Sequence, residues 1–151
     1  MNMKSKRGET LIEVVLAIGL AVMVLFALVI LGSSSVKTST SSSRRAQAEK
    51  LSAAGIESIR YFRDNSGFNS LTVGCYKIDP SQSNGVSALD CSLWDSITLN
   101  GAANTFDRKI EISDYAAQAS MKKITVTSRW FESGGVGDYK QVVIETVLTQ
   151  W

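Results

Sequence analysis

This chain has few side chains suited to catalysis. It contains two cysteines, Cys75 and Cys91, and no histidine. Without histidine, it lacks the commonest general acid or base and the commonest imidazole metal ligand. It also has no nucleophile motif, phosphate-binding loop or Cys/His metal spacing. The sequence therefore argues against an enzyme, and it implies neither a metal nor a cofactor.

The two cysteines favour a disulfide. Both follow a long apolar segment, and an even number of cysteines in an exported domain is typical of a bridge. Closing a loop of this length contributes roughly 3 kcal/mol in the chain-entropy model. The alternative is a pair of buried free thiols. We expect a Cys75–Cys91 bridge.

One carboxylate, Glu13, stands directly before that apolar segment. The eighteen residues from Val14 to Leu31 carry no charge, amide or hydroxyl. As a helix they cover about 27 Å, close to the hydrocarbon thickness of a bilayer. They are apolar on all sides, which predicts a membrane span. A carboxylate within a span costs about 2.5–3.5 kcal/mol and is usually paired or functional.

The charge distribution orients the span. The whole chain has a formal charge of +2, but residues 1–8 hold three basic side chains and no acid. Without them, 13 basic side chains stand against 14 acidic ones, a net charge of −1. The basic cluster ahead of the span places the N-terminus in the cytoplasm. The balance is unlike that of a nucleic-acid binder, so no nucleic-acid contact is predicted.

The basic leader ends in Gly8, and Glu9-Thr10-Leu11-Ile12-Glu13 precedes the apolar run. This boundary resembles the prepilin signature of type IV pilins and type II secretion pseudopilins. The resemblance implies cleavage by prepilin peptidase between Gly8 and Glu9, followed by N-methylation of Glu9. It also implies that Glu13 sets the axial register of a filament by meeting the new amine of a neighbouring subunit. The family usually has phenylalanine or another apolar residue where this chain has Glu9, which favours a minor subunit over the main repeating one.

Two other roles for Glu13 stay open. It can pair with the amine four residues earlier in its own helix. Alternatively, it lies at the level of the lipid headgroups, as charges at helix ends often do.

The resemblance implies a structural subunit of a type IV pilus-like or type II secretion-like filament. The precursor would be a single-pass protein of the inner (cytoplasmic) membrane with its head outside, and the assembled form a cell-surface or periplasmic filament. The implied partners are other pilin subunits through the N-terminal helix, prepilin peptidase, the assembly machinery and the membrane. Two alternatives remain: an uncleaved single-span protein with a binding head, and a secreted domain released near Ser33 by ordinary signal peptidase.

The residues after the span predict that the helix continues. Gly32–Ser43 is rich in serine and threonine but contains one glycine and no proline. We expect a helix from Thr10 to Asp64, continuous or interrupted by this segment, with a disordered tether as the alternative. A stripe at helical spacing is expected to pack as core: Ala48, Leu51, Gly55, Ile59 and Phe62. Asn65-Ser66-Gly67 should end the helix.

The C-terminal part predicts a small antiparallel sheet and hence an α+β, pilin-like fold, with the long helix packed on meandering strands. The expected segments are a leader (1–8), a transmembrane or assembly helix (9–31), its continuation (32–64) and a β-rich head (65–151). Strands are expected at Leu71–Ile78, Leu93–Leu99, Thr105–Ser113, Lys122–Glu132 and Tyr139–Trp151. Loops are expected at Asp79–Ser87 and Ser133–Asp138. Four aromatic residues are expected in the core: Tyr61, Trp94, Trp130 and Trp151.

Overall fold

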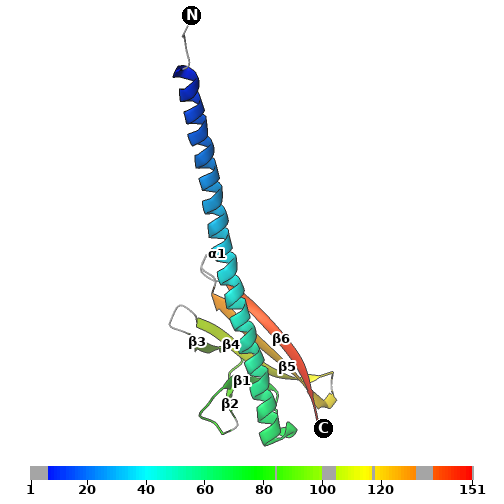
Figure 1. Cartoon of the computed structure of the whole chain (residues 1–151). Helices are drawn as coiled ribbons and strands as arrows, with labels where there is room; N and C mark the ends of the chain where they lie inside the picture. Colours follow the sequence, from blue (N-terminus) through cyan, green and yellow to red (C-terminus); the bar gives the residue numbers. More distant parts are fainter. Residues whose placement is uncertain (1–6, 84, 100–104, 117, 132–137, 151) are drawn as a thin grey trace, which may run out of the picture. The chain divides into compact units, whose positions relative to one another are not determined.

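The computed structural model describes residues 7–83, 85–99, 105–116, 118–131 and 138–150 (Figure 1). The chain divides into two compact units, residues 1–41 and residues 42–151. Helix α1 (Arg7–Ser66) contributes residues to both. We call residues 42–151 the head. It contains the last turns of α1 and all the strands.

The Ser/Thr-rich segment belongs to helix α1, so the structure has a helix where a disordered tether was the alternative. Ser33, Thr38 and Thr40 each donate a hydroxyl hydrogen bond to a backbone carbonyl three or four residues earlier, at 3.0–3.1 Å. These bonds pair the hydroxyls with carbonyls of the same helix. Unpaired serine and threonine hydroxyls could instead bond to backbone groups in non-helical conformations. An alanine side chain at Gly32 would meet nothing within 4 Å, so this glycine marks no close approach.

Within the head, one face of α1 packs against the sheet. The predicted stripe is confirmed, with Leu51 half-buried and two further members, Ser52 and Ile56, that the prediction lacked. The buried residues of this face are Ala48, Ser52, Gly55, Ile56, Ile59 and Phe62. The helix ends at Ser66. Gly67 follows with a φ of 84°, a conformation that favours glycine.

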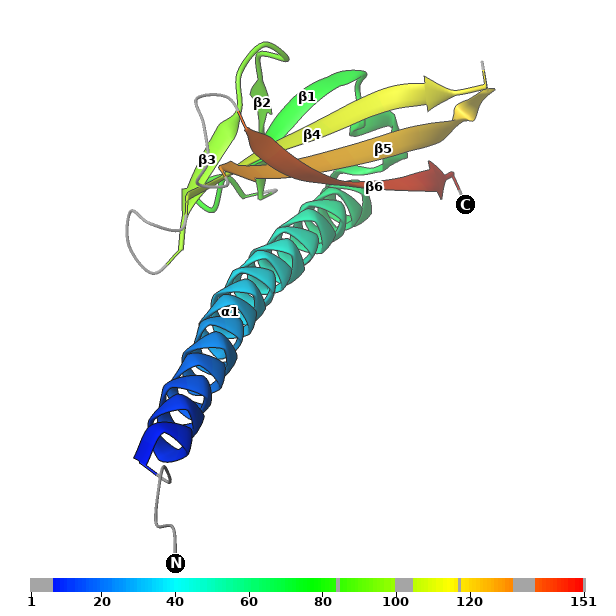
Figure 2. The same ribbon diagram turned by 90° about the horizontal axis from the view of Figure 1, so that it is seen from above.

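The head contains one antiparallel six-stranded sheet (Figure 2). Its order is β2-β1-β4-β5-β6. Strand β3 pairs with the same edge of β4 as β1 does, but with a different stretch of that strand. A short 3-10 helix, η1 (Phe68–Ser70), links α1 to the sheet. The strands are β1 (Gly74–Ile78), β2 (Val86–Leu89), β3 (Asp95–Thr98), β4 (Thr105–Tyr115), β5 (Gln118–Phe131) and β6 (Tyr139–Thr149). The predicted α+β class is therefore confirmed, but only β4-β5-β6 form a simple meander.

The first strands differ from the prediction. The strand expected at Leu71–Ile78 begins at Gly74, and the one expected at Leu93–Leu99 covers only Asp95–Thr98. The loop expected at Asp79–Ser87 is wrong at its end, because its last two residues open β2. Strand β2 has four residues, too few to show a period. It is defined as a strand by its pairing with β1, from Ile78↔Val86 to Cys75↔Leu89, and not by a pattern in its own sequence.

The last three strands agree well with the prediction. Strand β4 extends two residues beyond Ser113, and β5 starts four residues before Lys122. The expected hairpin between the last two strands is present, because Phe131 pairs with Tyr139. Glu132, Trp151 and all but the last residue of Ser133–Asp138 lie outside the described residues.

The helix-facing side chains of the sheet form two apolar clusters with α1. The smaller cluster contains Ala48, Phe106 and Trp130. The larger one contains Ile56, Ile59, Phe62, Leu71, Tyr76, Val86, Ile110, Ile112, Ile124, Val126 and Leu148. Gly55 lets the helix approach closely, since an added Cβ there would lie 3.0 Å from Val126 Cγ1. The Ser52 hydroxyl donates to the Ser128 hydroxyl at 2.7 Å, satisfying a buried polar pair between helix and strand.

The aromatic residues divide between core and surface. Trp130 is buried as expected. The expectation for Tyr61 is wrong, since its side chain is 54% exposed. It points away from the helix face that the sheet covers and lies near Gly85 in the β1–β2 connection. Trp94 is only half-buried, and Trp151 lies outside the described residues.

Candidate functional site

The residues of the charged boundary lie at the start of α1. Gly8 and Glu9 are helical, and Glu13 follows Glu9 after about one turn, a rise of roughly 6 Å. The Glu13 side chain is exposed. The structure therefore places Glu13 one turn from the backbone nitrogen that cleavage after Gly8 would free.

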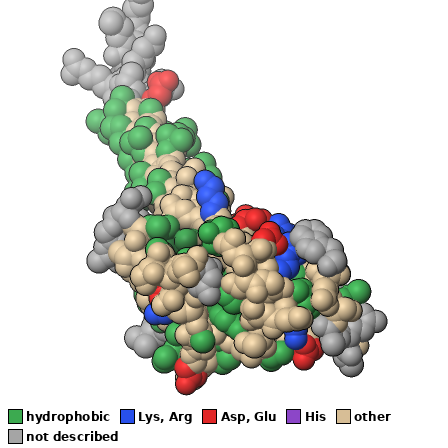
Figure 3. All heavy atoms as spheres, turned by 90° about the horizontal axis from the view of Figure 1, so that it is seen from below, with side chains coloured by type: hydrophobic (Ala, Val, Ile, Leu, Met, Phe, Trp, Pro, Cys, Tyr) green, Lys and Arg blue, Asp and Glu red, His purple; other side chains and the backbone are tan. Residues whose placement is uncertain are grey.

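The apolar residues after Glu13 are exposed along the whole segment. Large side chains from Leu11 to Leu31 are between 44% and 72% exposed. Figure 3 shows hydrophobic side chains over the visible side of this segment. The helix is long and apolar enough to cross a membrane, with a mean hydropathy of 3.3 over its most apolar window. A signal sequence near the N-terminus passes the same test. The core helix of a soluble protein also passes it but would be mostly buried. In the described chain, none of the apolar window is buried.

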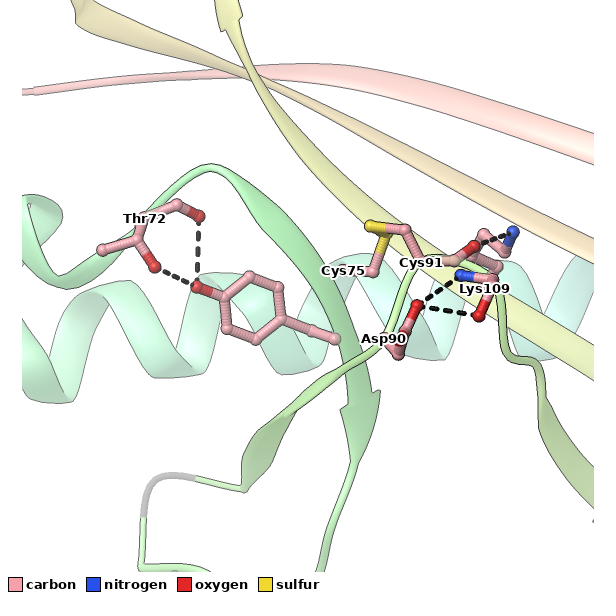
Figure 4. The surroundings of a disulfide bond; sticks show 7 residues. Thr72, Cys75, Asp90, Cys91 and Lys109 are labelled. Carbon is pink, nitrogen blue, oxygen red and sulfur yellow. Dashed lines mark hydrogen bonds between the residues drawn. A yellow bond between two sulfur atoms is a disulfide. The ribbon is translucent and has the colours of Figure 1, made fainter.

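The two cysteines form the expected disulfide (Figure 4). Their Cα atoms lie 5.2 Å apart. Cys75 belongs to β1 and is 3% exposed, whereas Cys91 lies at the surface between β2 and β3. The Lys109 ammonium donates to the Cys91 carbonyl at 2.6 Å. The bridge and this hydrogen bond fasten the β2–β3 connection to the sheet.

A carboxylate shapes the turn at Cys91. The backbone N–H and the hydroxyl of Ser92 both donate to Asp90 Oδ1 at 2.8 Å. These two hydrogen bonds lower the pKa of Asp90, the backbone one most, because they stabilise its charged form. The arrangement is a local turn motif, and we assign it a structural role.

The β2–β3 connection crosses the sheet face that points away from α1, which we call the outer face. Strand β2 ends opposite Cys75 and β3 begins opposite Arg108, so residues 90–94 run back along β1. Trp94 lies over two cations of the outer face, with its ring centre 3.8 Å from Arg129 Cζ and 4.6 Å from Lys109 Nζ. Cation–π contacts thus hold the end of the connection.

Sequence reasoning missed a buried ion pair next to this connection. Arg108 is 4% exposed, and its guanidinium donates to Asp95 Oδ2 at 2.7 Å. The signal was present: in Phe106-Asp107-Arg108-Lys109-Ile110, the arginine occupies a core position of the alternation. A charge at such a position requires a partner. The partner is thirteen residues earlier in the chain, so no local pattern identifies it.

The other titratable groups and hollows show no catalytic arrangement in the described part of the chain. A hydrogen bond from the Ser81 hydroxyl is the largest effect that lowers the pKa of Asp79, and a hydrogen bond from Lys123 does the same for Glu145. Both carboxylates lie at the surface. Among the described residues, no group of three or more His, Cys, Asp or Glu side chains is placed to hold a metal ion. One hollow of about 260 Å³ lies beside η1, and a shallow groove of about 590 Å³ lies between α1 and β6.

No family model, curated protein or solved structure matches this chain.

Proposed function

We propose that this chain is a structural subunit of a type IV pilus-like or type II secretion-like filament, of the minor-pilin or pseudopilin kind. One observation carries the proposal. A carboxylate, Glu13, stands one helical turn after a Gly8-Glu9 junction and directly before eighteen apolar residues. An exposed apolar helix with an acid directly before its apolar run suits a bundle of like helices.

The mechanism follows from the charge of Glu13. In the precursor, the basic leader stays in the cytoplasm and the apolar helix lies in the inner membrane. Prepilin peptidase cuts after Gly8, and the new amine of Glu9 is cationic, with or without N-methylation. An unpaired carboxylate in the span would cost about 2.5–3.5 kcal/mol. A neighbouring subunit that is displaced along the filament axis can bring its amine to Glu13. This pairing compensates the cost, and it does so in only one axial register of the two helices.

Assembly exchanges lipid contact for helix contact. The large side chains of the apolar segment are exposed in the single chain. They can therefore contact lipid in the membrane or neighbouring helices in the filament. The head would remain outside the cytoplasm, where its disulfide persists. The partners are other pilin subunits, the peptidase and the assembly machinery.

The first test is the N-terminus of the mature protein. The full chain is expressed together with a prepilin peptidase, and the membrane fraction is analysed by N-terminal sequencing and intact mass. We expect Glu9 as the first residue and an uncut Gly8→Ala variant. Gly19→Ala is the matched control, because its added Cβ meets nothing within 4 Å, and it should be cut normally. A mature chain that begins at Met1 supports an uncleaved membrane protein, and one that begins near Ser33 supports a secreted domain; either result overturns the proposal.

The second test concerns assembly. Glu13→Gln keeps the size of the side chain and removes its charge, so the cleaved subunit should be lost from sheared filaments while it accumulates in the membrane. Glu57→Gln is the control, since Glu57 is an exposed carboxylate of α1 that pairs with Arg60 in the head. The ratio of filament to membrane protein on immunoblots is the measurement. Normal incorporation of Glu13→Gln would show that its charge does not set the register.

A further inference from the structure

Strand β6 forms a long, regular edge of the sheet. It pairs with β5 through eleven consecutive residue pairs, from Met121↔Thr149 to Phe131↔Tyr139, without a bulge. It contains no proline. Natural proteins usually protect such edges with bulges, prolines, short strands or charged side chains, and β6 carries only the charges of Lys140 and Glu145. In the described part of the chain, no strand pairs with the other side of β6 (Figure 2).

The surroundings of this edge leave room for another strand. The groove of about 590 Å³ runs between α1 and β6, next to Val142, Val143 and Ile144. Its helix side contains the small residues Ala46 and Ala53 together with the charged residues Arg45, Glu49 and Lys50. On the outer face of the sheet, the apolar side chains of β6 are partly exposed: Tyr139 49%, Val143 48% and Val147 40%. A strand added to β6 would cover both sides of this edge.

The residue pattern of β6 is complementary to itself. In a continuous antiparallel sheet, directly opposed residues point to the same face. A two-fold axis at Val143 therefore places Val143 opposite its own copy, Tyr139 opposite Val147, and Gln141 opposite Glu145. On the helix-facing side, Val142 opposes Ile144, and Lys140 opposes Thr146. Apolar residues meet apolar ones, and an amide meets a carboxylate; such cross-strand pairs stabilise sheets.

The registers next to this one lack this match, since an axis at Val142 would place Val143 opposite Gln141 and Tyr139 opposite Glu145. An axis at Ile144 would place Val143 opposite Glu145 and Gln141 opposite Val147. An axis at Glu145 would place two carboxylates directly opposite each other, which is destabilising. We propose that β6 pairs antiparallel with β6 of a second copy of this chain, centred on Val143, so that the two sheets become one.

This contact differs in kind from the one proposed for the filament. A two-fold contact uses the same surface on both partners and closes after two copies, whereas a filament needs a contact that repeats. The β6 contact therefore concerns pairs of heads and does not depend on cleavage after Gly8. Its failure would leave the filament proposal intact, and the reverse also holds.

Cysteine cross-linking of the full chain in membranes tests the register. Directly opposed residues lie about 4.5–5.5 Å apart between Cα atoms, within the range of roughly 4.4–6.8 Å that a disulfide spans. Val143→Cys should therefore form a covalent dimer under mild oxidation with copper phenanthroline. Gln141→Cys and Glu145→Cys should each stay monomeric, because residue 141 lies about 14 Å from its own copy at about 3.4 Å per residue. Co-expression of these two variants should restore the dimer.

Further arms of the test keep it decisive. Val143→Lys, which places a charge at the centre of the edge, should abolish non-covalent dimers of the detergent-solubilised chain in analytical ultracentrifugation. The pattern should be the same in a Gly8→Ala background. Equal cross-linking of all three single variants, a dimer from Ile144→Cys in preference to Val143→Cys, or a monomeric Val143→Cys variant would each overturn the proposal.

Discussion

At the scale of single residues, the head contains an ion pair, Arg108 with Asp95, that is largely removed from water. The Arg108 side chain is 5% exposed and that of Asp95 is 18% exposed. Taking both charges out of water is costly, and their attraction repays that cost only while both are present. Removing one partner therefore leaves a buried, uncompensated charge.

We predict that Asp95→Ala lowers the free energy of unfolding of the head by about 3 kcal/mol, since breaking a buried pair leaves one charge unpaired. Denaturant titration of the detergent-solubilised full chain, followed by tryptophan fluorescence, measures it. Glu57→Ala is the control. It removes one partner of the Arg60–Glu57 pair, whose side chains are 44% and 67% exposed, and should cost only about 0.5 kcal/mol. If both variants lost the same free energy of unfolding, burial of the Arg108–Asp95 pair would not make the head more dependent on Asp95.

At the scale of elements, the disulfide determines where the β2–β3 connection lies. It links β1 to the connection across a sequence separation of 16 residues. Strands β2 and β3, which flank the connection, have four residues each. The bridge, the Lys109 hydrogen bond and the cation–π contacts of Trp94 together keep residues 90–94 on the outer face.

We predict that the Cys75→Ala/Cys91→Ala double variant is less stable by about 3 kcal/mol, because the open loop gains conformational entropy in the unfolded chain. Urea titration with and without dithiothreitol measures the effect. The reductant should destabilise the wild type by a similar amount and leave the double variant unchanged. A wild type that keeps its full stability after verified reduction would contradict the prediction.

At the scale of the whole molecule, the two units differ in how much of their apolar surface is exposed. The head contains two buried apolar clusters, although some of its large apolar side chains, such as Val73 and Val143, are exposed. In the N-terminal unit, the apolar side chains from Leu11 to Leu31 are exposed. Soluble monomers rarely expose a continuous apolar surface of this extent. This unit is therefore a candidate membrane span, compatible with single-pass anchoring.

We predict that the full chain resists extraction from membranes by alkaline carbonate. Leu20→Arg should increase the extracted fraction, because a charge near the middle of a span costs about 2.5–3.5 kcal/mol. Val73→Arg is the control, since Val73 and Leu20 are both 58% exposed but Val73 lies in the head. Immunoblots of pellet and supernatant measure the result. Extraction of the wild type and Leu20→Arg to the same extent would argue against a membrane-embedded helix.

Features that depend on local periodicity were predictable from the sequence. The apolar run, the helical stripe from Ala48 to Phe62 and the alternation in β4, β5 and β6 all follow from the spacing of side chains along one element. Each of these elements is long enough to show several periods. The cysteine pair was also predictable, because two cysteines in such a chain have only each other.

Features that depend on partners distant in sequence could be identified only in the folded chain. Strand β2 exists because β1 lies beside it, and β3 shares one side of β4 with β1. Arg108 can be buried because the crossing connection brings Asp95 to it, and Tyr61 is exposed because the sheet covers the opposite face of its helix. The position of β6 at the edge of the described sheet likewise results from strand order, which no single segment encodes. Local spacing specifies which face of an element is apolar, whereas packing between elements selects what covers it.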